Sequence, residues 1–99
     1  KGIANVKLRA PGKRAHGSRP WEGENAIQKL IPVLHELQAM YPVGDRYGST
    51  LSINMLNAGE AMNQIPDEAS AWLDFRSFSM AEINEYRLSL KKLVGEHGL

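Results

Sequence analysis

The sequence predicts an α+β fold, a ferredoxin-like split βαβ two-layer sandwich with an antiparallel sheet and both helices on one face. Two observations carry this prediction. With 99 residues, the chain is long enough for a single domain with one hydrophobic core. Apolar residues recur at every second position in three segments and at helical spacing in two, in the order strand, helix, strand, strand, helix. A fourth strand follows in this topology, so either the chain is cut short after Leu99 or the sheet ends at three strands.

A change of period separates the first strand from the first helix. Residues 4–10 alternate between apolar and polar, as in a half-buried strand. Asn25 and Gln28 have the three-residue spacing of a capping box, which predicts that a helix begins there. The residues predicted to share the inward face of this helix are Ile27, Leu30, Ile31, Leu34, Leu37 and Tyr41.

The second strand is predicted at residues 50–56, after a turn region at residues 42–48. Leu51, Ile53 and Met55 alternate with polar residues and are expected to share one face of the sheet.

The third strand and the second helix complete the predicted order. A loop over residues 57–67 leads into a strand at residues 69–76. Ser79 and Glu82 form a second capping box, and Gly95 or Gly98 is expected to end this helix. Its predicted inward residues are Ile83, Tyr86, Leu90, Leu93 and Val94.

The composition excludes several classes of function. The formal net charge is +1 and no block of basic residues occurs, which argues against a nucleic-acid partner. No apolar run approaches the length of a membrane span, so no membrane contact is expected. The absence of cysteine rules out disulfides and thiolate metal sites, and it fits a reducing, cytoplasmic location.

A self-contained catalytic site is not recognisable in the sequence. His35 and His97 lie on predicted helices and are interpreted as ordinary solvated histidines. No pair of histidines or carboxylates has the spacing of zinc ligands, so no metal site is predicted in this chain. Ser18 stands near His16, but residues so close in sequence rarely orient as nucleophile and base, and no third group is evident.

The segment over residues 16–26 has a more distinctive amino-acid composition than an ordinary loop. It combines a histidine, two glycines, a proline and a tryptophan between a strand and a helix. A purely structural interpretation stays open, in which Trp21 anchors the loop, Pro20 stiffens it and His16 caps it.

The segment over residues 59–67 is the second such loop, and the strand after it ends in Leu-Asp-Phe-Arg at residues 73–76. The structural alternative here is a turn at Gly59, with Asp74 and Arg76 paired on the solvent face.

Taken together, these segments resemble a known family, the dinuclear-zinc exopeptidases. It includes acetylornithine deacetylase, succinyl-diaminopimelate desuccinylase, glutamate carboxypeptidases and aminoacylases. Residues 16–26 are similar to a pattern His-Gly-Ser-x-Pro-x-x-Gly-x-Asn-Ala in the inserted dimerisation, or lid, domain of that family. Residues 59–67 are similar to its Gly-x-x-x-Asn-x-Ile-Pro-Asp pattern, and residues 73–76 to its Leu-Asp-x-Arg strand ending. The motif positions matched are Gly17, Pro20, Gly23, Asn25, Gly59 and Pro66.

The resemblance implies roles for three side chains. The family histidine matched by His16 reaches the partner subunit's active site and donates a hydrogen bond to the oxygen that becomes negative when the amide carbonyl is attacked. The positions matched by Asn63 and Arg76 help to hold the carboxylate end of the substrate, with Arg76 acting as a charge-assisted fork.

The resemblance also implies the partners. Residues 1–99 would form one dimerisation domain of a larger two-domain hydrolase, pairing with its own copy through the strand at 50–56 and the helix at 25–40. Two zinc ions, or cobalt, belong to the catalytic domain of such a hydrolase and not to this chain, which alone should hydrolyse nothing. The implied substrate is a small N-acyl amino acid or peptide.

Two other readings remain open at the level of sequence. A ferredoxin-like scaffold also hosts free-standing ligand-binding or regulatory domains. A small phosphate-ester or acyl-phosphate hydrolase on this scaffold ranks last, because no nucleophile or anion-binding loop emerges.

Overall fold

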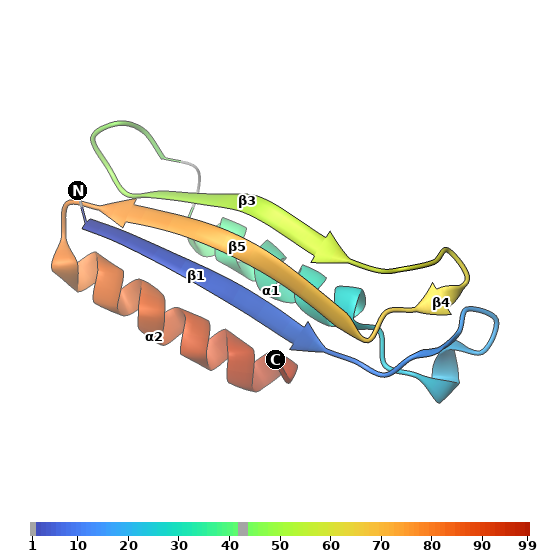
Figure 1. The fold of residues 1–99 in the computed structure, drawn as a ribbon. Helices are drawn as coiled ribbons and strands as arrows, with labels where there is room; N and C mark the ends of the chain where they lie inside the picture. Colours follow the sequence, from blue (N-terminus) through green and yellow to red (C-terminus); the bar gives the residue numbers. More distant parts are fainter. Residues whose placement is uncertain (1, 42–43) are drawn as a thin grey trace.

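A computed structural model describes residues 2–41 and 44–99 and contains the predicted elements in the predicted order (Figure 1). Two short strands and a 3₁₀ turn are added to them. Of the turn region predicted at residues 42–48, Pro42 and Val43 lie outside the described residues.

The main sheet is a split βαβ unit. It consists of β1 (Gly2–Pro11), β5 (Glu68–Ser77) and β3 (Thr50–Ala58) in the spatial order β1-β5-β3. Because β1 and β3 are both antiparallel to β5, they are parallel to each other, and α1 (Ala26–Met40) forms the crossover between them. The α+β prediction is therefore confirmed, with a main sheet of three strands in the described part of the chain.

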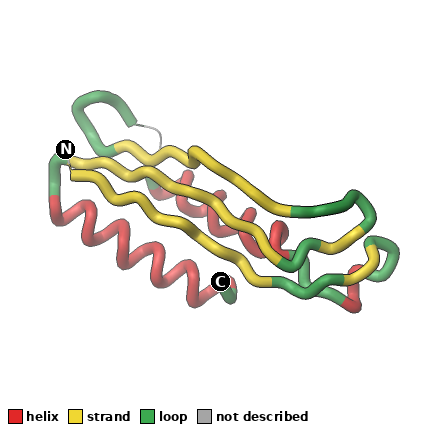
Figure 2. Tube along the Cα trace, viewed as in Figure 1, coloured by secondary structure: helices red, strands yellow, loops and turns green. Residues whose placement is uncertain are grey.

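Both helices lie against one face of this sheet, as Figure 2 shows. The helix starts are those predicted from the sequence: the side chain of Asn25 accepts a hydrogen bond from the backbone N–H of Gln28, and that of Ser79 from the N–H of Glu82. The second helix, α2 (Met80–His97), ends at Gly98, so the alternative end at Gly95 is wrong. Neither helix is long and apolar enough to cross a membrane.

The core lies between the sheet and the two helices. Its largest fully buried side chains are Leu30, Val33, Leu37, Leu73, Phe75, Ser77, Tyr86 and Leu93. The prediction for the first helix was wrong at two positions: Ile31, predicted to face inward, is 56% exposed, and Val33, which was not among the predicted inward residues, is buried in the core. The apolar stripe of α1 is thus wider than the part that the sheet covers.

A bulge in β3 corrects the predicted face of Met55. Ile53 pairs with Leu73 of β5, but Met55 pairs with Trp72, so Asn54 is an extra residue in the ladder. Residues opposite each other share a face, and Met55 therefore lies with Trp72 on the face away from the helices. Leu56 takes the inner face instead.

An aromatic cluster occupies one end of the core. The rings of Phe75 and Tyr86 are stacked with centroids 4.3 Å apart, and Tyr41 meets each of them edge-on. The Tyr41 hydroxyl lies 3.2 Å from Oγ of Ser89. The buried Tyr86 hydroxyl has no hydrogen-bond partner among the described residues, and burial raises the pKa of Tyr86, so it stays protonated.

The Tyr86→Phe variant is expected to be as stable as the wild type or more stable, by up to about 1 kcal/mol, because an unsatisfied buried hydroxyl is removed. Urea denaturation measures the free energy of unfolding. Tyr41→Phe is the matched control, and it should lose about 0.5–1 kcal/mol with the contact to Ser89. A clear loss of stability in Tyr86→Phe would contradict the expectation.

Candidate functional site

Two loops meet at one tip of the molecule and bring His16 and Asn63 together. The short strands β2 (Ala15–His16) and β4 (Gln64–Ile65) pair antiparallel at the end of the sheet opposite the N-terminus (Figure 1). The backbone N–H of Gly17 donates to the carbonyl of Asn63 at 2.7 Å. A depression of about 460 Å³ at this tip is lined by Arg14, Ala15, His16, Ala61, Asn63 and Gln64.

The loop that carries His16 is closed by its own backbone. The N–H groups of Lys13 and Glu24 donate to each other's carbonyls at 2.8 and 3.0 Å. Gly23 lies in this closure, where a Cβ atom would come within 2.6 Å of the carbonyl oxygen of Lys13. Pro20 opens the 3₁₀ helix η1 (Pro20–Glu22). Trp21 is 76% exposed, so the idea that it anchors the loop is wrong.

Arg14 ties the second loop to the first. Its Nε donates to Asp67 at 2.9 Å and its Nη2 to Glu60 at 3.1 Å, and these partners flank Asn63 in sequence. The carbonyl of Pro66 accepts from the N–H of Ala26, the first residue of α1. Thus ion pairs and backbone bonds together hold the two loops in one arrangement.

The imidazole of His16 is held at one nitrogen only. Its Nδ1 receives the backbone N–H of Ser18 at 3.1 Å and lies 2.7 Å from the Ser18 hydroxyl. Its Nε2 has no hydrogen-bond partner in residues 2–41 and 44–99, and the residue is exposed. This nitrogen therefore faces outward with its hydrogen-bonding capacity unused. The two residues thus make a contact that is unusual at this spacing, but no third group among the described residues contacts the ring.

Arg76 lies at the other end of the molecule. The stretch of β5 from Glu68 to Arg76 alone spans roughly 25 Å at about 3.3 Å per residue, and the loop with His16 continues beyond it. Both nitrogens of the Arg76 fork contact Asp74, at 2.9 and 3.2 Å. These hydrogen bonds and the charge of Asp74 raise the pKa of Arg76. A single chain thus brings His16 and Asn63 together but leaves Arg76 apart, in the ion pair that the structural alternative describes.

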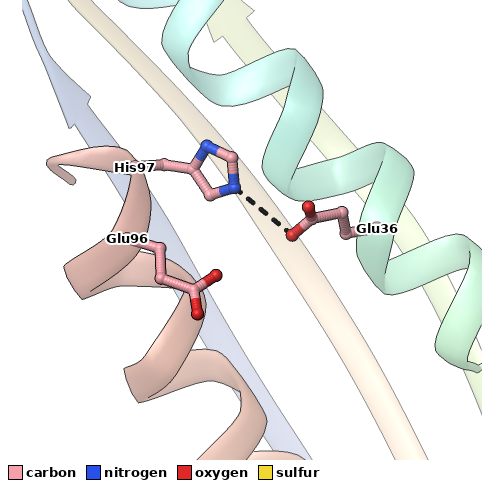
Figure 3. Close-up of side chains that lie close together, drawn as sticks. All are labelled: Glu36, Glu96 and His97. Atoms are coloured by element: carbon pink, nitrogen blue, oxygen red, sulfur yellow. Dashed lines mark hydrogen bonds and ion pairs between the residues drawn. The ribbon is translucent and has the colours of Figure 1, made fainter.

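The nearest approach to a metal site in the described ranges lies between the two helices. Nε2 of His97 contacts Glu36 at 3.3 Å, and a carboxylate oxygen of Glu96 lies close by (Figure 3). One histidine, already engaged with a carboxylate at the surface, does not match the enclosed ligand sets of zinc sites. This cluster is a hydrogen-bonded contact that links α1 to the end of α2. The described residues do not offer the ligand set that dinuclear zinc needs in the family that the sequence resembles.

Comparison with known proteins decides the family. The family model described as peptidase dimerisation domain matches residues 1–99. This chain belongs to the peptidase dimerisation domain family. The dimerisation domain is 36% identical over 106 residues to succinyl-diaminopimelate desuccinylase of Corynebacterium glutamicum, which covers 99% of this chain and 29% of that protein. It is 38% identical over 86 residues to a probable carboxypeptidase of Aspergillus flavus, covering 77% of this chain and 21% of that protein.

Solved structures share the fold of the dimerisation domain. A tripeptidase from Staphylococcus aureus superposes with a TM-score of 0.80 at 23% identity, over 92% of this chain and 24% of that one. An amidase of the hydantoinase/carbamoylase family from Burkholderia phymatum gives 0.83 at 19% identity, over 96% and 24%. The dimerisation domain therefore spans less than a third of the length of these relatives.

The sequence did not reveal that two further residues, Arg14 and Ser18, make contacts that shape the tip. Arg14 belongs to none of the motifs singled out in the sequence, and only the pairing of β2 with β4 reveals its two carboxylate partners. Ser18 was set aside because of its closeness to His16 in sequence, although a tight turn makes that spacing favourable. Its position in the His-Gly-Ser tripeptide was the signal available.

Gly59 adopts φ = +84°, so the turn predicted at this position needs a residue that tolerates the left-handed region. Gly59→Ala is expected to lower the free energy of unfolding by about 1 kcal/mol, since no neighbour within 4 Å adds a clash. Gly95→Ala is the control: Gly95 lies inside α2 in open space, and alanine there should stabilise by roughly 0.5–1 kcal/mol. Thermal unfolding of both variants checks the pair, and equal effects at the two sites would refute the role given to Gly59.

Proposed function

We propose that this domain pairs with its own copy and, within a larger hydrolase, completes an active site that draws residues from both subunits. The observation that carries the proposal is the separation described above: His16 and Asn63 lie at one tip, whereas Arg76 lies at the opposite end of the sheet. Side chains so far apart in one chain cannot hold the same small substrate.

A two-fold axis at β3 removes this separation. Strand β3 lies at the edge of the sheet, beginning beside Arg76 and ending toward the tip. If β3 pairs antiparallel with its copy, the start of one strand lies beside the end of the other. Arg76 of one subunit then lies on the same side of the dimer as His16 of its mate. The registers of the two sheets therefore support an active site shared across the dimer.

The surface beside β3 is suited to such an interface. An apolar groove of about 260 Å³ separates α1 from the edge strand and is lined by Ile27, Leu30, Ile31, Leu34, Leu56, Ala58 and Ala69. Ile31 and Leu56 in this groove are both more than half exposed. Exposed apolar residues next to an unpaired strand edge are typical of a surface that another chain covers.

In the proposed site, this chain contributes hydrogen-bond donors and not the hydrolytic chemistry. His16 donates from Nε2 to the oxygen of the amide carbonyl as negative charge develops there. Asn63 on the same tip and Arg76 of the other subunit bind the substrate carboxylate. The catalytic domain of the hydrolase would supply the metal. A small N-acyl amino acid or peptide fits these donors, and the cytoplasm is the proposed compartment.

The test is complementation between inactive variants of the full-length hydrolase. His16→Ala and Arg76→Ala homodimers lack one donor in every site. After subunit exchange, half of the dimers are mixed, and each mixed dimer has one intact site if the two residues come from different subunits. The mixture should therefore regain about a quarter of the wild-type activity.

The matched control exchanges His16→Ala with Asn63→Ala. Both residues lie on the same tip, so every site in the mixed dimer still lacks one of them, and no activity should return. Differently tagged subunits confirm that exchange has occurred. If exchanged His16→Ala and Arg76→Ala dimers stay as inactive as the parents, the shared site is refuted.

A further inference from the structure

The contact between His16 and Ser18 settles which ring nitrogen is free. The backbone N–H of Ser18 can only donate, and it lies 3.1 Å from Nδ1 with its hydrogen toward the ring. A hydrogen on Nδ1 would meet that hydrogen head-on. Nδ1 of the neutral ring therefore carries a lone pair, and the ring hydrogen is on Nε2.

The Ser18 hydroxyl adds a second donor to the same nitrogen. Its oxygen lies 2.7 Å from Nδ1, the shorter of the two contacts. Since Nδ1 is an acceptor, the hydroxyl hydrogen points at it, and both polar hydrogens of Ser18 converge on one lone pair. No other described residue has a hydrogen bond to this ring, so its orientation depends on Ser18.

We propose that Ser18 is a positioning residue, which holds neutral His16 in the Nε2–H tautomer and directs that hydrogen out of the tip. The inference rests on the proposed function, because the Nε2–H group is the donor assigned there to the carbonyl oxygen. The proposed function requires a hydrogen on Nε2, and Ser18 is the residue that keeps it there by donating to Nδ1. Ser18 itself touches no substrate.

A loop-stabilising role is the competing explanation, because a hydrogen bond between residues two apart also closes a turn. The two roles predict changes in different measured quantities when the contact is removed. A loop contact affects the stability of the chain, whereas a positioning contact changes the ratio of the two ring tautomers. The tautomer ratio is therefore the deciding measurement.

The experiment is nitrogen NMR of the histidine rings in the 99-residue chain, at a pH where they are neutral. The two ring nitrogens give well-separated signals according to which one carries the hydrogen. His35 is an internal reference, because its ring is exposed and has no hydrogen-bond partner among the described residues. His16→Gln assigns the signals by loss.

The wild type should show the Nε2–H form of His16 in clear excess over the ratio at His35. Ser18→Ala keeps the backbone N–H and removes the hydroxyl, and it should raise the ratio of the Nδ1–H form to the Nε2–H form by about fivefold, the change that one hydrogen bond of ordinary strength supports. Ser18→Thr restores a hydroxyl and should return the wild-type ratio. An Nδ1–H form in the wild type, or an unchanged ratio in Ser18→Ala, overturns the inference.

A kinetic arm separates this inference from the proposed function. In the full-length hydrolase, Ser18→Ala should lower kcat in proportion to the measured fall in the Nε2–H fraction, with little change in KM, and Ser18→Thr should recover it. If the tautomer shifts as expected but kcat does not follow, Ser18 still positions His16 and the catalytic role of His16 is refuted. If kcat falls with no shift in tautomer, Ser18 acts through the loop and the inference is refuted.

Discussion

Replacing His16 with alanine in the full-length hydrolase is expected to lower kcat by about a hundredfold, the usual effect of losing one donor to a developing oxyanion. The reason is that Nε2–H gains most of its interaction energy when the carbonyl oxygen becomes negative, and not when the substrate binds. KM should therefore change little. Steady-state kinetics on an N-acyl amino acid or peptide that the hydrolase turns over gives both constants.

The control for this variant is His35→Ala. His35 is an exposed histidine of α1, so its loss removes a ring of the same chemistry outside the tip. Dimer content by light scattering and metal content by emission spectroscopy should match the wild type in both variants. Unchanged kcat in His16→Ala would show that His16 only shapes its loop, and it would reduce this domain to a dimerising role.

Introducing a charge at Ile31 is expected to weaken dimerisation by about thirtyfold or more, in line with the loss of a central interface anchor. Ile31 lies in the apolar groove beside β3, and its side chain is half exposed in the single chain. In Ile31→Glu, association would bury a carboxylate with no partner of opposite charge, which is costly. Analytical ultracentrifugation over a concentration series measures the dissociation constant.

Leu88→Glu is the matched control for that variant. Leu88 is an apolar residue of α2 with 67% of its surface exposed, outside the set of residues that lines the groove. Its substitution should leave the dissociation constant within about twofold of the wild type, as for most residues outside an interface. If Leu88→Glu dissociates the dimer and Ile31→Glu does not, the interface lies on the other helix.

The elements that could be predicted from the sequence are those with a strong period or a local cap. Asn25 and Ser79 mark the helix starts because each needs only its own side chain and an N–H three residues on. The strands with strict alternation, such as residues 4–10, were found for the same reason. In these cases the residues that determine the structure are close together in the sequence.

The features that could not be predicted depend on neighbours far away in the sequence. Leu51, Ile53 and Met55 alternate as in a regular strand, and only the pairing with Trp72 reveals the bulge at Asn54. Strands of two residues, such as Ala15–His16, have no period to detect. The resemblance supplied His16, Asn63 and Arg76 as a set, but their distribution over two ends of the molecule follows from the sheet register alone.

The elongated shape of the domain has a mechanical consequence. Its longest dimension is 48 Å, with the His16 tip and the Arg76 end on opposite sides of that length. A body of this length would act as a lever if it turned about a hinge: a rotation of about 10° at one end would displace the other end by roughly 8 Å. Hydrogen-bond donors at the far tip would thus enter or leave a site through a rotation that barely disturbs the near end.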